Sequence, residues 1–353
     1  MIAFIFFLLF IPFFALVGVY AERKIAAFIQ DRLGPMEVGK YGFLQTFADI
    51  LKLLQKEDIV PLLADRKLFL FAPFLVYASV FAGFAVIPLT NALVGSQADV
   101  GVFYLLTFVS LDIIGLLMAG WGANNKFAMY GAIRSVAQII SYEIPLGLSV
   151  ICVIITTQTL DLQEISFQQG ILNNTDEKSY LLGLAWVEVT NWGGFFTWNI
   201  FRMPVLFFAF VVFFIASLAE CNRTPFDLPE AESELVAGFQ TEYSGMRWAF
   251  LMLAEYGMML LVSFLASILF LGSWNTPLPN LWALKLATYT TGFAWGIFWL
   301  FAKAFVLIFL QMWIRWTYPR LRVDQLMTLC WKYLTPFSLI LLILCAIWRL
   351  TLI

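Results

Sequence analysis

The stretch from Ala219 to Glu234, AECNRTPFDLPEAESE, is a dense polar island in a chain of 353 residues. It lies between two long apolar runs, Met203–Ala219 and Met246–Leu271, each about as long as a helix that crosses a bilayer. Counted on to Glu242, the island holds six of the 23 acidic residues of the chain. This arrangement predicts two membrane helices joined by an acidic loop.

Only part of the acidic island has a purely structural explanation. Asp227, Pro229 and Glu230 are typical of a helix N-terminus, with proline in the first turn and an acid at the capping-box position. This interpretation accounts for about two of the acids. The acids that remain as functional candidates are Glu220, Glu232, Glu234 and Glu242.

The composition of the whole chain predicts an integral membrane protein built of helices. Hydrophobic residues make up 62% of the chain and charged residues 12%, about half the charged share of a soluble domain. The mean hydropathy is +0.87. The net charge of −2 leaves no basic patch dense enough for nucleic acid, so that class of partner is excluded.

The residue types also exclude much chemistry. The chain has no histidine, so it can form neither a Ser-His nucleophile pair nor an imidazole metal site. Its four cysteines are scattered, and no Gly-rich phosphate loop follows a strand pattern. We therefore expect no metal site and no redox centre on this chain, and proton chemistry that uses carboxylates, lysine, tyrosine and water.

Apolar runs of about 20 residues predict about eight transmembrane helices in a single polytopic domain, residues 1–353. The predicted spans are Ile2–Tyr20, Leu68–Leu89, Gly101–Trp121, Val136–Gln158, Met203–Ala219, Met246–Leu271, Leu284–Trp313 and Leu334–Leu352. The first run lacks a preceding positive residue and a small-residue cleavage site, so we expect a retained helix rather than a signal peptide.

The positions of lysine and arginine predict the orientation, because loops on the inner side of a membrane are enriched in both. With the N-terminus outside, 16 of the 21 lysines and arginines fall in inner loops. The exceptions are Lys178, Arg202, Lys285 and Arg349 in outer loops, and Lys303 within a span. We therefore expect both termini outside, in the periplasm, and the acidic loop 220–245 inside.

The first inner loop is predicted to carry an amphipathic helix over residues 43–56. Its apolar residues recur at helical spacing and leave the charged residues on the other side. The apolar side holds Phe43, Phe47, Ile50, Leu51 and Leu54. The length suits a helix that lies in the membrane interface. The outer loop 159–202 is polar and then aromatic, which is compatible with a short interfacial hairpin or helix.

Three glutamates fall at membrane depth, where ionisable groups are functional candidates. They are Glu143, Glu220 and Glu255. Pro145 removes the amide that would bond the carbonyl of Ser141, and we expect this to make local room for water.

A structural alternative stays open for each of these acids, which could pair with Arg134, Arg223 or Arg247 and only fix helix packing. Taken together, the acids outnumber the nearby bases. Crowded, buried carboxylates favour the protonated form, which suits proton exchange near neutral pH. Asp112 and Lys303 lie in other spans, and we expect them to form a structural pair.

Each inner loop also carries a group of motifs. The first holds Glu22-Arg23-Lys24, Asp31-Arg32-Leu33-Gly34-Pro35 and Gly42-Phe43-Leu44-Gln45 through Phe47-Ala48-Asp49, with Lys52 and Glu57. The second holds Gly120-Trp121, Asn125-Lys126, Gly131, Arg134, Ala137-Gln138 and Ser141-Tyr142-Glu143. The acidic loop runs E-x-N-R-T-P-F-D-L-P-E-A-E-S-E-L-V-A-G, and the last inner loop holds Trp313-Ile314-Arg315, Tyr318-Pro319-Arg320 and Asp324-Gln325-Leu326-Met327. In these residues, and over nearly its whole length, the chain resembles the H-type membrane subunit of proton-pumping NADH:quinone oxidoreductase, respiratory complex I (subunit 1 in mitochondria).

The resemblance implies a subunit that anchors the peripheral arm and forms the membrane part of the quinone tunnel. It also implies coupling of quinone reduction to proton pumping through buried carboxylates. The implied proton relay is Glu143, Glu220, Asp227, Glu230, Glu232, Glu234 and Glu255. The implied quinone-binding residues are Glu22, Arg23, Lys24, Arg32, Phe47, Asp49, Lys52 and Arg223, and Arg223 is also expected to be a positive partner within the acidic loop.

The resemblance further implies quinone, either ubiquinone or menaquinone, as substrate. NAD, FMN and iron–sulfur clusters would belong only to partner subunits. The implied partners are the quinone-site subunits of the peripheral arm, the small membrane subunits, the antiporter-like subunits and membrane lipid. The loop lengths favour a bacterial inner membrane over the mitochondrial inner membrane. Gln240 stands where bacterial relatives commonly carry histidine, and the outer loop from Asn173 to Asn199 is longer than in short mitochondrial forms.

Three alternatives remain at this point. A stand-alone proton or ion transporter would favour broken helices in matched halves and short inner loops, whereas these inner loops are long and charged. A pure structural anchor would not need buried acids. The membrane subunit of an energy-converting hydrogenase-like complex is the alternative nearest to the resemblance.

Overall fold

The regular structure of this chain is helical. The computed structural model describes residues 2–171, 181–183, 189, 192–228, 232–280 and 285–352. These residues form helices and one isolated β-bridge, between Pro88 and Val94, and they contain no strand. The predicted all-α class is therefore confirmed for the described part of the chain.

Seven helices among the described residues are long and apolar enough to cross a membrane. They are α1 (Ile2–Ile29), α3 (Arg66–Gly83, continued by the 3-10 turn Phe84–Val86), α4 (Gly101–Gly122), α5 (Lys126–Thr157), α10 (Gly245–Leu269), α12 (Phe293–Thr317) and a last run of α13 (Val323–Thr328), a π-helix (Leu329–Leu334) and α14 (Thr335–Leu352). Another apolar helix, α8 (Pro204–Glu220), has 17 residues and is shorter. The predicted number of eight spans is therefore not confirmed.

Several helix ends differ from the sequence prediction. Helix α5 begins ten residues before the predicted Val136, because Asn125 caps it by accepting a hydrogen bond from the backbone N–H of Phe127. Helix α12 begins at Phe293 rather than Leu284, and a separate short helix, α11 (Leu286–Tyr289), precedes it. The apolar runs predicted the helices, and caps and turns set their ends.

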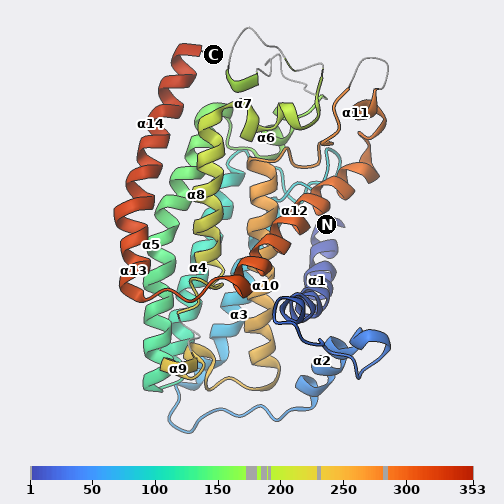
Figure 1. Cartoon of the computed structure of the whole chain (residues 1–353). Coiled ribbons are helices and arrows are strands. Elements are labelled where there is room, and N and C mark those ends of the chain that lie inside the picture. The colour runs from blue at the N-terminus through green and yellow to red at the C-terminus, as the bar shows by residue number, and fades with distance from the viewer. Residues whose placement is uncertain are drawn as a thin grey trace.

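The helices are arranged as an upright bundle with two inclined members. Helices α14, α5, α8, α4, α3 and α10 run roughly along one axis, whereas α12 crosses the bundle obliquely and α1 lies beside it (Figure 1). The short helices α2 (Gln45–Gln55) and α9 (Glu232–Leu235) lie at one end. Helices α6 (Leu162–Gln168), α7 (Asn199–Arg202) and α11 lie at the other end, as does the C-terminus.

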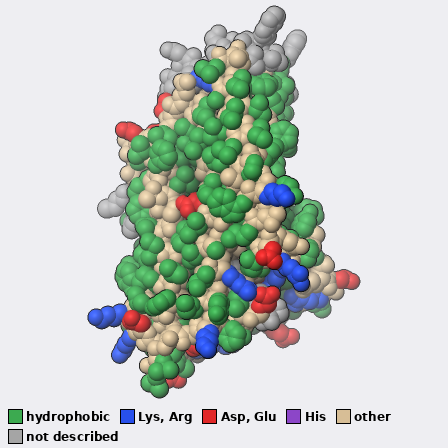
Figure 2. Space-filling view, turned by 90° about the vertical axis from the view of Figure 1, so that its left-hand side faces the viewer, with side chains coloured by type: hydrophobic (Ala, Val, Ile, Leu, Met, Phe, Trp, Pro, Cys, Tyr) green, Lys and Arg blue, Asp and Glu red, His purple; other side chains and the backbone are tan. Residues whose placement is uncertain are grey.

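Helix α10 forms the centre of the bundle. Every residue from Tyr256 to Leu269 is buried, as expected for a helix that is surrounded on all sides. By contrast, α14 exposes a row of large apolar side chains, among them Ile340, Ile343 and Ile347. On the side of the molecule that carries α14, apolar side chains cover the upper part and charged ones gather toward the lower end (Figure 2). This is the pattern of a protein with an apolar belt and one charged end.

Helix α5 continues through Pro145, and its freed carbonyl has a partner. The carbonyl oxygen of Ser141 accepts a hydrogen bond from the thiol of Cys330, with a sulfur–oxygen distance of 2.9 Å. One residue on, the hydroxyl of Tyr142 donates to the carbonyl of Leu326 at 3.0 Å. The expectation that Pro145 makes room for water at Ser141 is therefore wrong, because the last inner loop fills this place.

This contact yields a stability prediction. Replacing Cys330 by Val should lower the free energy of unfolding by about 1–3 kcal/mol, because a buried carbonyl then has no donor. Replacing Pro145 by Ala in the same chain should recover part of the loss, because the new backbone N–H can bond the carbonyl of Ser141. Midpoints of thermal unfolding in detergent would measure both changes. Equal midpoints for the single and double variants would contradict this account of the contact.

The predicted helix in the first inner loop is present as α2. It spans Gln45–Gln55, within the predicted range 43–56, and packs against α1 and α10. Phe47, Leu51 and Leu54 remain exposed, although their spacing marks them as the apolar side. The helix thus presents apolar side chains that the described part of this chain does not cover.

Candidate functional site

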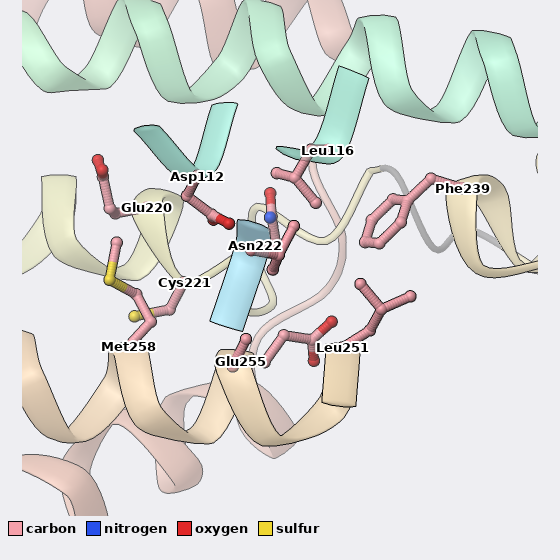
Figure 3. A pocket seen from close by; sticks show the side chains of 11 residues that line it. Asp112, Leu116, Glu220, Cys221, Asn222, Phe239, Leu251, Glu255 and Met258 are labelled. Carbon is pink, nitrogen blue, oxygen red and sulfur yellow. The ribbon is translucent and has the colours of Figure 1, made fainter. Parts of the chain in front are cut away.

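Three helices bring carboxylates to one place in the bundle. A small cavity of about 20 Å³ is accessible to water there, which is close to the minimum that holds one water molecule. Asp112 of α4, Glu220 of α8 and Glu255 of α10 line it (Figure 3). Asn222, in the loop after α8, also lines it, and its side-chain oxygen is 3.3 Å from both Ser135 Oγ and Gln138 Nε2 of α5.

Asp112 is a member of this site, and the expected pair with Lys303 is wrong. Asp112 is 9% exposed, and its Oδ1 atom has no hydrogen-bond partner among the described residues. Lys303 instead donates to the carbonyls of Ser273 and Asn275 at 2.9 and 2.6 Å and lies over the ring of Trp198. The residue types suggested an ion pair, but the helix packing places the two side chains in different clusters.

Glu220 ends α8 inside the protein. It is 4% exposed, and its Oε2 atom meets no hydrogen-bond partner in the part of the chain that the structure describes. Figure 3 shows its carboxylate directed toward α5, away from the labelled residues on the other side of the cavity. On α5, Glu143 accepts a short hydrogen bond from Ser110 of α4. The charge of Glu143 acts on Glu220, so the two carboxylates are near each other.

Glu255 is oriented by an amide relay from the loop before α10. Gln240 Nε2 donates to Glu255 Oε1 at 2.8 Å, and Trp248 Nε1 donates to Gln240 Oε1 at 2.9 Å. The amide of Gln240 cannot carry a proton at this position, unlike an imidazole. Glycine at position 131 of α5 allows this loop to approach, since a Cβ there would lie 2.6 Å from the Cα of Gly238.

A second buried cluster lies around Glu22 of α1. Arg223 Nη1 donates to both oxygens of Glu22, at 2.9 and 2.8 Å, and Tyr256 Oη donates to it at 2.6 Å. Arg315 of α12 makes a further short ion pair with the same carboxylate. Burial lowers the pKa of Arg223, but Glu22, Tyr256 and Glu255 together raise it above its usual value, so the guanidinium stays charged. The expectation that Arg223 pairs within the acidic loop is therefore wrong, because its partner lies on α1.

Three further arginines of the inner loops are paired with acids, which tests the structural alternative for the buried acids. Ion pairs join Arg134 to Glu234, Arg247 to Asp58 and Arg320 to Asp227, at 2.6, 2.7 and 3.1 Å. Together with the pair of Arg223 and Glu22, they show that Arg134, Arg223 and Arg247 bind acids other than Glu143 and Glu220. Packing by these arginines therefore does not explain those two acids.

The remaining residues of the expected quinone site lie around α1 and α2. Arg23 Nη1 pairs with Asp49 Oδ2 at 2.6 Å, and Lys24 Nζ donates to the carbonyl of Pro35 at 2.8 Å. Arg32 donates to Gln30 at 2.7 Å, whereas Phe47 and Lys52 are exposed on α2. The expected set thus divides into a buried part, Glu22 and Arg223, and a surface part on α1 and α2.

Part of the acidic loop lies outside the described residues. Pro229 and Glu230, and with them the predicted capping box, belong to that part, and of Glu232 only the backbone is described, at the start of α9. Asp227 is buried and paired, and Glu234 is exposed and paired. The described carboxylates that face the cavity are therefore Asp112, Glu220 and Glu255.

Comparison with known proteins gives consistent matches along the chain. The family model described as NADH dehydrogenase matches residues 2–346. An H subunit of NADH-quinone oxidoreductase from Cytophaga hutchinsonii, the one numbered 2, is 58% identical over 355 residues, which cover 98% of this chain and 97% of the relative. The H subunit of NADH-quinone oxidoreductase from Chlorobaculum parvum is 54% identical, and the match covers 97% of this chain and 90% of the relative. The H subunit from Bacteroides thetaiotaomicron is 45% identical, and the match covers 94% of this chain and 86% of the relative.

Proposed function

This chain belongs to the family of the H subunits of NADH-quinone oxidoreductase, respiratory complex I, and from that membership we propose that it passes protons between buried carboxylates when quinone is reduced. The membership confirms the resemblance found in the loop motifs. One observation carries the proposal: Asp112 and Glu220 are buried beside one cavity, and each keeps an oxygen without a hydrogen-bond partner among the described residues. Buried carboxylates without cationic partners bind protons readily, so they suit proton exchange.

The proposed relay runs from the loop before α10 into the bundle. Glu255 accepts a hydrogen bond from the amide of Gln240, and it also lines the cavity. Asp112 and Glu220 share the cavity, where a water molecule could connect them. Glu143 of α5, whose charge acts on Glu220, would be the inner end of the relay. Asp227, Glu230, Glu232 and Glu234 remain proposed members at its loop end.

We propose that quinone enters beside α1 and α2. The exposed apolar side chains Phe43, Phe47, Leu51 and Leu54 can border a passage for an apolar tail, and the ion pair of Arg23 with Asp49 lies beside them. In this proposal α2 would lie in the membrane interface. Glu22 and Arg223 would lie at the inner end of that passage, with Lys24, Arg32 and Lys52 supporting its mouth.

The orientation and partners complete the proposal. Charged side chains gather at the end with α2 and α9, so this end would face the cytoplasm and dock the peripheral arm, and both termini would face the periplasm of a bacterial inner membrane. NAD, FMN and iron–sulfur clusters would be held by partner subunits, and the quinone would be ubiquinone or menaquinone. The small and the antiporter-like membrane subunits would receive the signal. Docking on a hydrogenase-like arm remains the competing proposal, ahead of a stand-alone transporter.

Photo-crosslinking tests the placement of the quinone. An azido-quinone applied to native membranes should label peptides between Arg23 and Leu54, or between Glu220 and Glu242, because these segments would border the passage. Excess unlabelled quinone should remove the label, and a peptide of the outer end, such as α6, serves as the control. If competable label appeared only on other polypeptides, the proposed tunnel would be contradicted. This chain would then remain as a proton relay and an anchor only.

A further inference from the structure

Arg223 lies between the two buried clusters. It follows the cavity-lining residues Glu220 and Asn222 in the loop after α8, and it is 3% exposed. Its guanidinium lies over the ring of Tyr256 at 4.7 Å from the centroid, and Tyr256 is the neighbour of cavity-lining Glu255. The same guanidinium therefore touches the Glu22 cluster and the edge of the carboxylate site.

The contact of Arg223 with Glu22 uses only one of its three nitrogens. Nη1 donates to both carboxylate oxygens, whereas Nε and Nη2 are buried and have no hydrogen-bond partner among the described residues. An arginine that binds a carboxylate commonly uses two parallel N–H groups. Leaving a buried donor unpaired costs about 1–3 kcal/mol. The guanidinium thus keeps two nitrogens that could bind a second anion.

Glu255 is the acid best placed to be that second anion. The charged groups around the guanidinium are Glu22 from α1, Arg315 from α12, which shares Glu22, and Glu255 from α10. The pKa of Arg223 is lowered by burial and raised by Glu22, Tyr256 and Glu255, so the charge of Glu255 acts on the guanidinium in the present arrangement. Glu255 also lines the cavity that Asp112 and Glu220 share (Figure 3).

We propose that Arg223 is a positioning residue with two anionic partners. Its guanidinium binds Glu22 in the state seen here and moves to Glu255 when the ion pair with Glu22 breaks. In the first state the cavity carboxylates keep their negative environment and favour bound protons. In the second state a buried cation joins them and favours proton release. Events beside α1 would thereby change proton occupancy beside α10. This inference rests on the proposed function, since it gives the relay its trigger.

The test is a double-mutant cycle in the assembled complex. Glu22→Gln should leave Arg223 trapped at Glu255 and lower the kcat of quinone reduction about tenfold. Arg223→Gln, and the double variant Glu22→Gln with Arg223→Gln, should each lower kcat by only about threefold, because no cation remains to be trapped. The double variant therefore should be faster than Glu22→Gln alone.

Two results would overturn the inference. One is a double variant slowed by the product of the two single effects, which is expected of two independent structural roles. The other is a double variant as slow as Glu22→Gln alone, which is expected if the loss comes from the missing carboxylate of Glu22 and not from a trapped cation. Asp58→Asn is the matched control, since it removes the carboxylate partner of another arginine, Arg247, at the same end of the molecule. It should show no such dependence on Arg223.

A second variant keeps the test decisive if Glu22→Gln does not assemble. Arg223→Lys keeps the charge and one nitrogen for Glu22 but loses the planar fork. It should assemble and lower kcat about threefold; full kcat would contradict the need for a second set of donors. Full proton pumping in Glu220→Gln would remove Glu220 from the relay but not the dependence between positions 22 and 223, so the two failures can be told apart.

Discussion

Replacing Glu220 by Gln is expected to lower proton pumping coupled to quinone reduction at least about tenfold, without loss of assembly. Gln has nearly the same shape as Glu, but its amide cannot release or bind a proton near neutral pH. The Oε2 atom of Glu220 has no hydrogen-bond partner among the described residues, so the substitution removes few contacts. A structural effect should therefore be small, and the loss should fall on proton transfer.

The measurement is the acidification produced by NADH oxidation in inverted membrane vesicles, normalised to the amount of assembled complex. Glu164→Gln is the matched control, because Glu164 lies at the other end of the bundle, where it accepts a hydrogen bond from Thr159. It should pump normally. Normal pumping by an assembled Glu220→Gln complex would remove Glu220 from the relay.

Replacing Gly131 by Ala is expected to lower the stability of the protein and to disturb the site as well. A Cβ at position 131 would lie 2.6 Å from the Cα of Gly238 and 3.0 Å from the backbone nitrogen of Phe239, and neither atom belongs to a flexible side chain. The loop must move away, which also displaces Gln240 from Glu255. We expect a loss of about 1–3 kcal/mol of stability and less assembled complex in membranes.

Gly147→Ala in the same helix provides the control for this prediction. A Cβ at position 147 meets nothing within 4 Å among the described residues, so the change should stabilise α5 by up to about 1 kcal/mol. Thermal inactivation midpoints of the two variants should therefore shift in opposite directions. Equal shifts would show that the approach of the loop to Gly131 does not hold the site together.

The helical class and the candidate acids can be predicted from the sequence, because both depend on local residue types. The apolar runs indicate the helices, and the acids at membrane depth are Glu143, Glu220 and Glu255. The predicted pair of Asp112 with Lys303 is absent among the described residues. The sequence indicates how deep a residue lies in the membrane, but not which side of its helix faces a neighbouring helix. The place of Asp112 beside the cavity follows only from the packing of α4 against its neighbours.

Two other errors have the same origin in long-range contacts. The sequence favours a partner for Arg223 within its own loop, but its partner Glu22 is 201 residues away in the chain. The carbonyl of Ser141 is expected to need water, but the thiol that binds it belongs to Cys330, 189 residues away. The one available signal is that Glu22 and Arg315 both occur within charged inner-loop motifs, and it does not specify which acid meets which base.

The central claim is that quinone reduction changes the proton occupancy of the buried carboxylates, and infrared difference spectroscopy on the assembled complex tests it most directly. Spectra recorded before and after quinone reduction should contain a band of protonated carboxyl groups that gains or loses intensity. This band should weaken in Glu220→Gln and in Asp112→Asn, and it should persist in Glu164→Gln. Identical difference spectra in the unchanged protein and all three variants would contradict the claim, because these carboxylates would then keep their protons fixed while quinone is reduced.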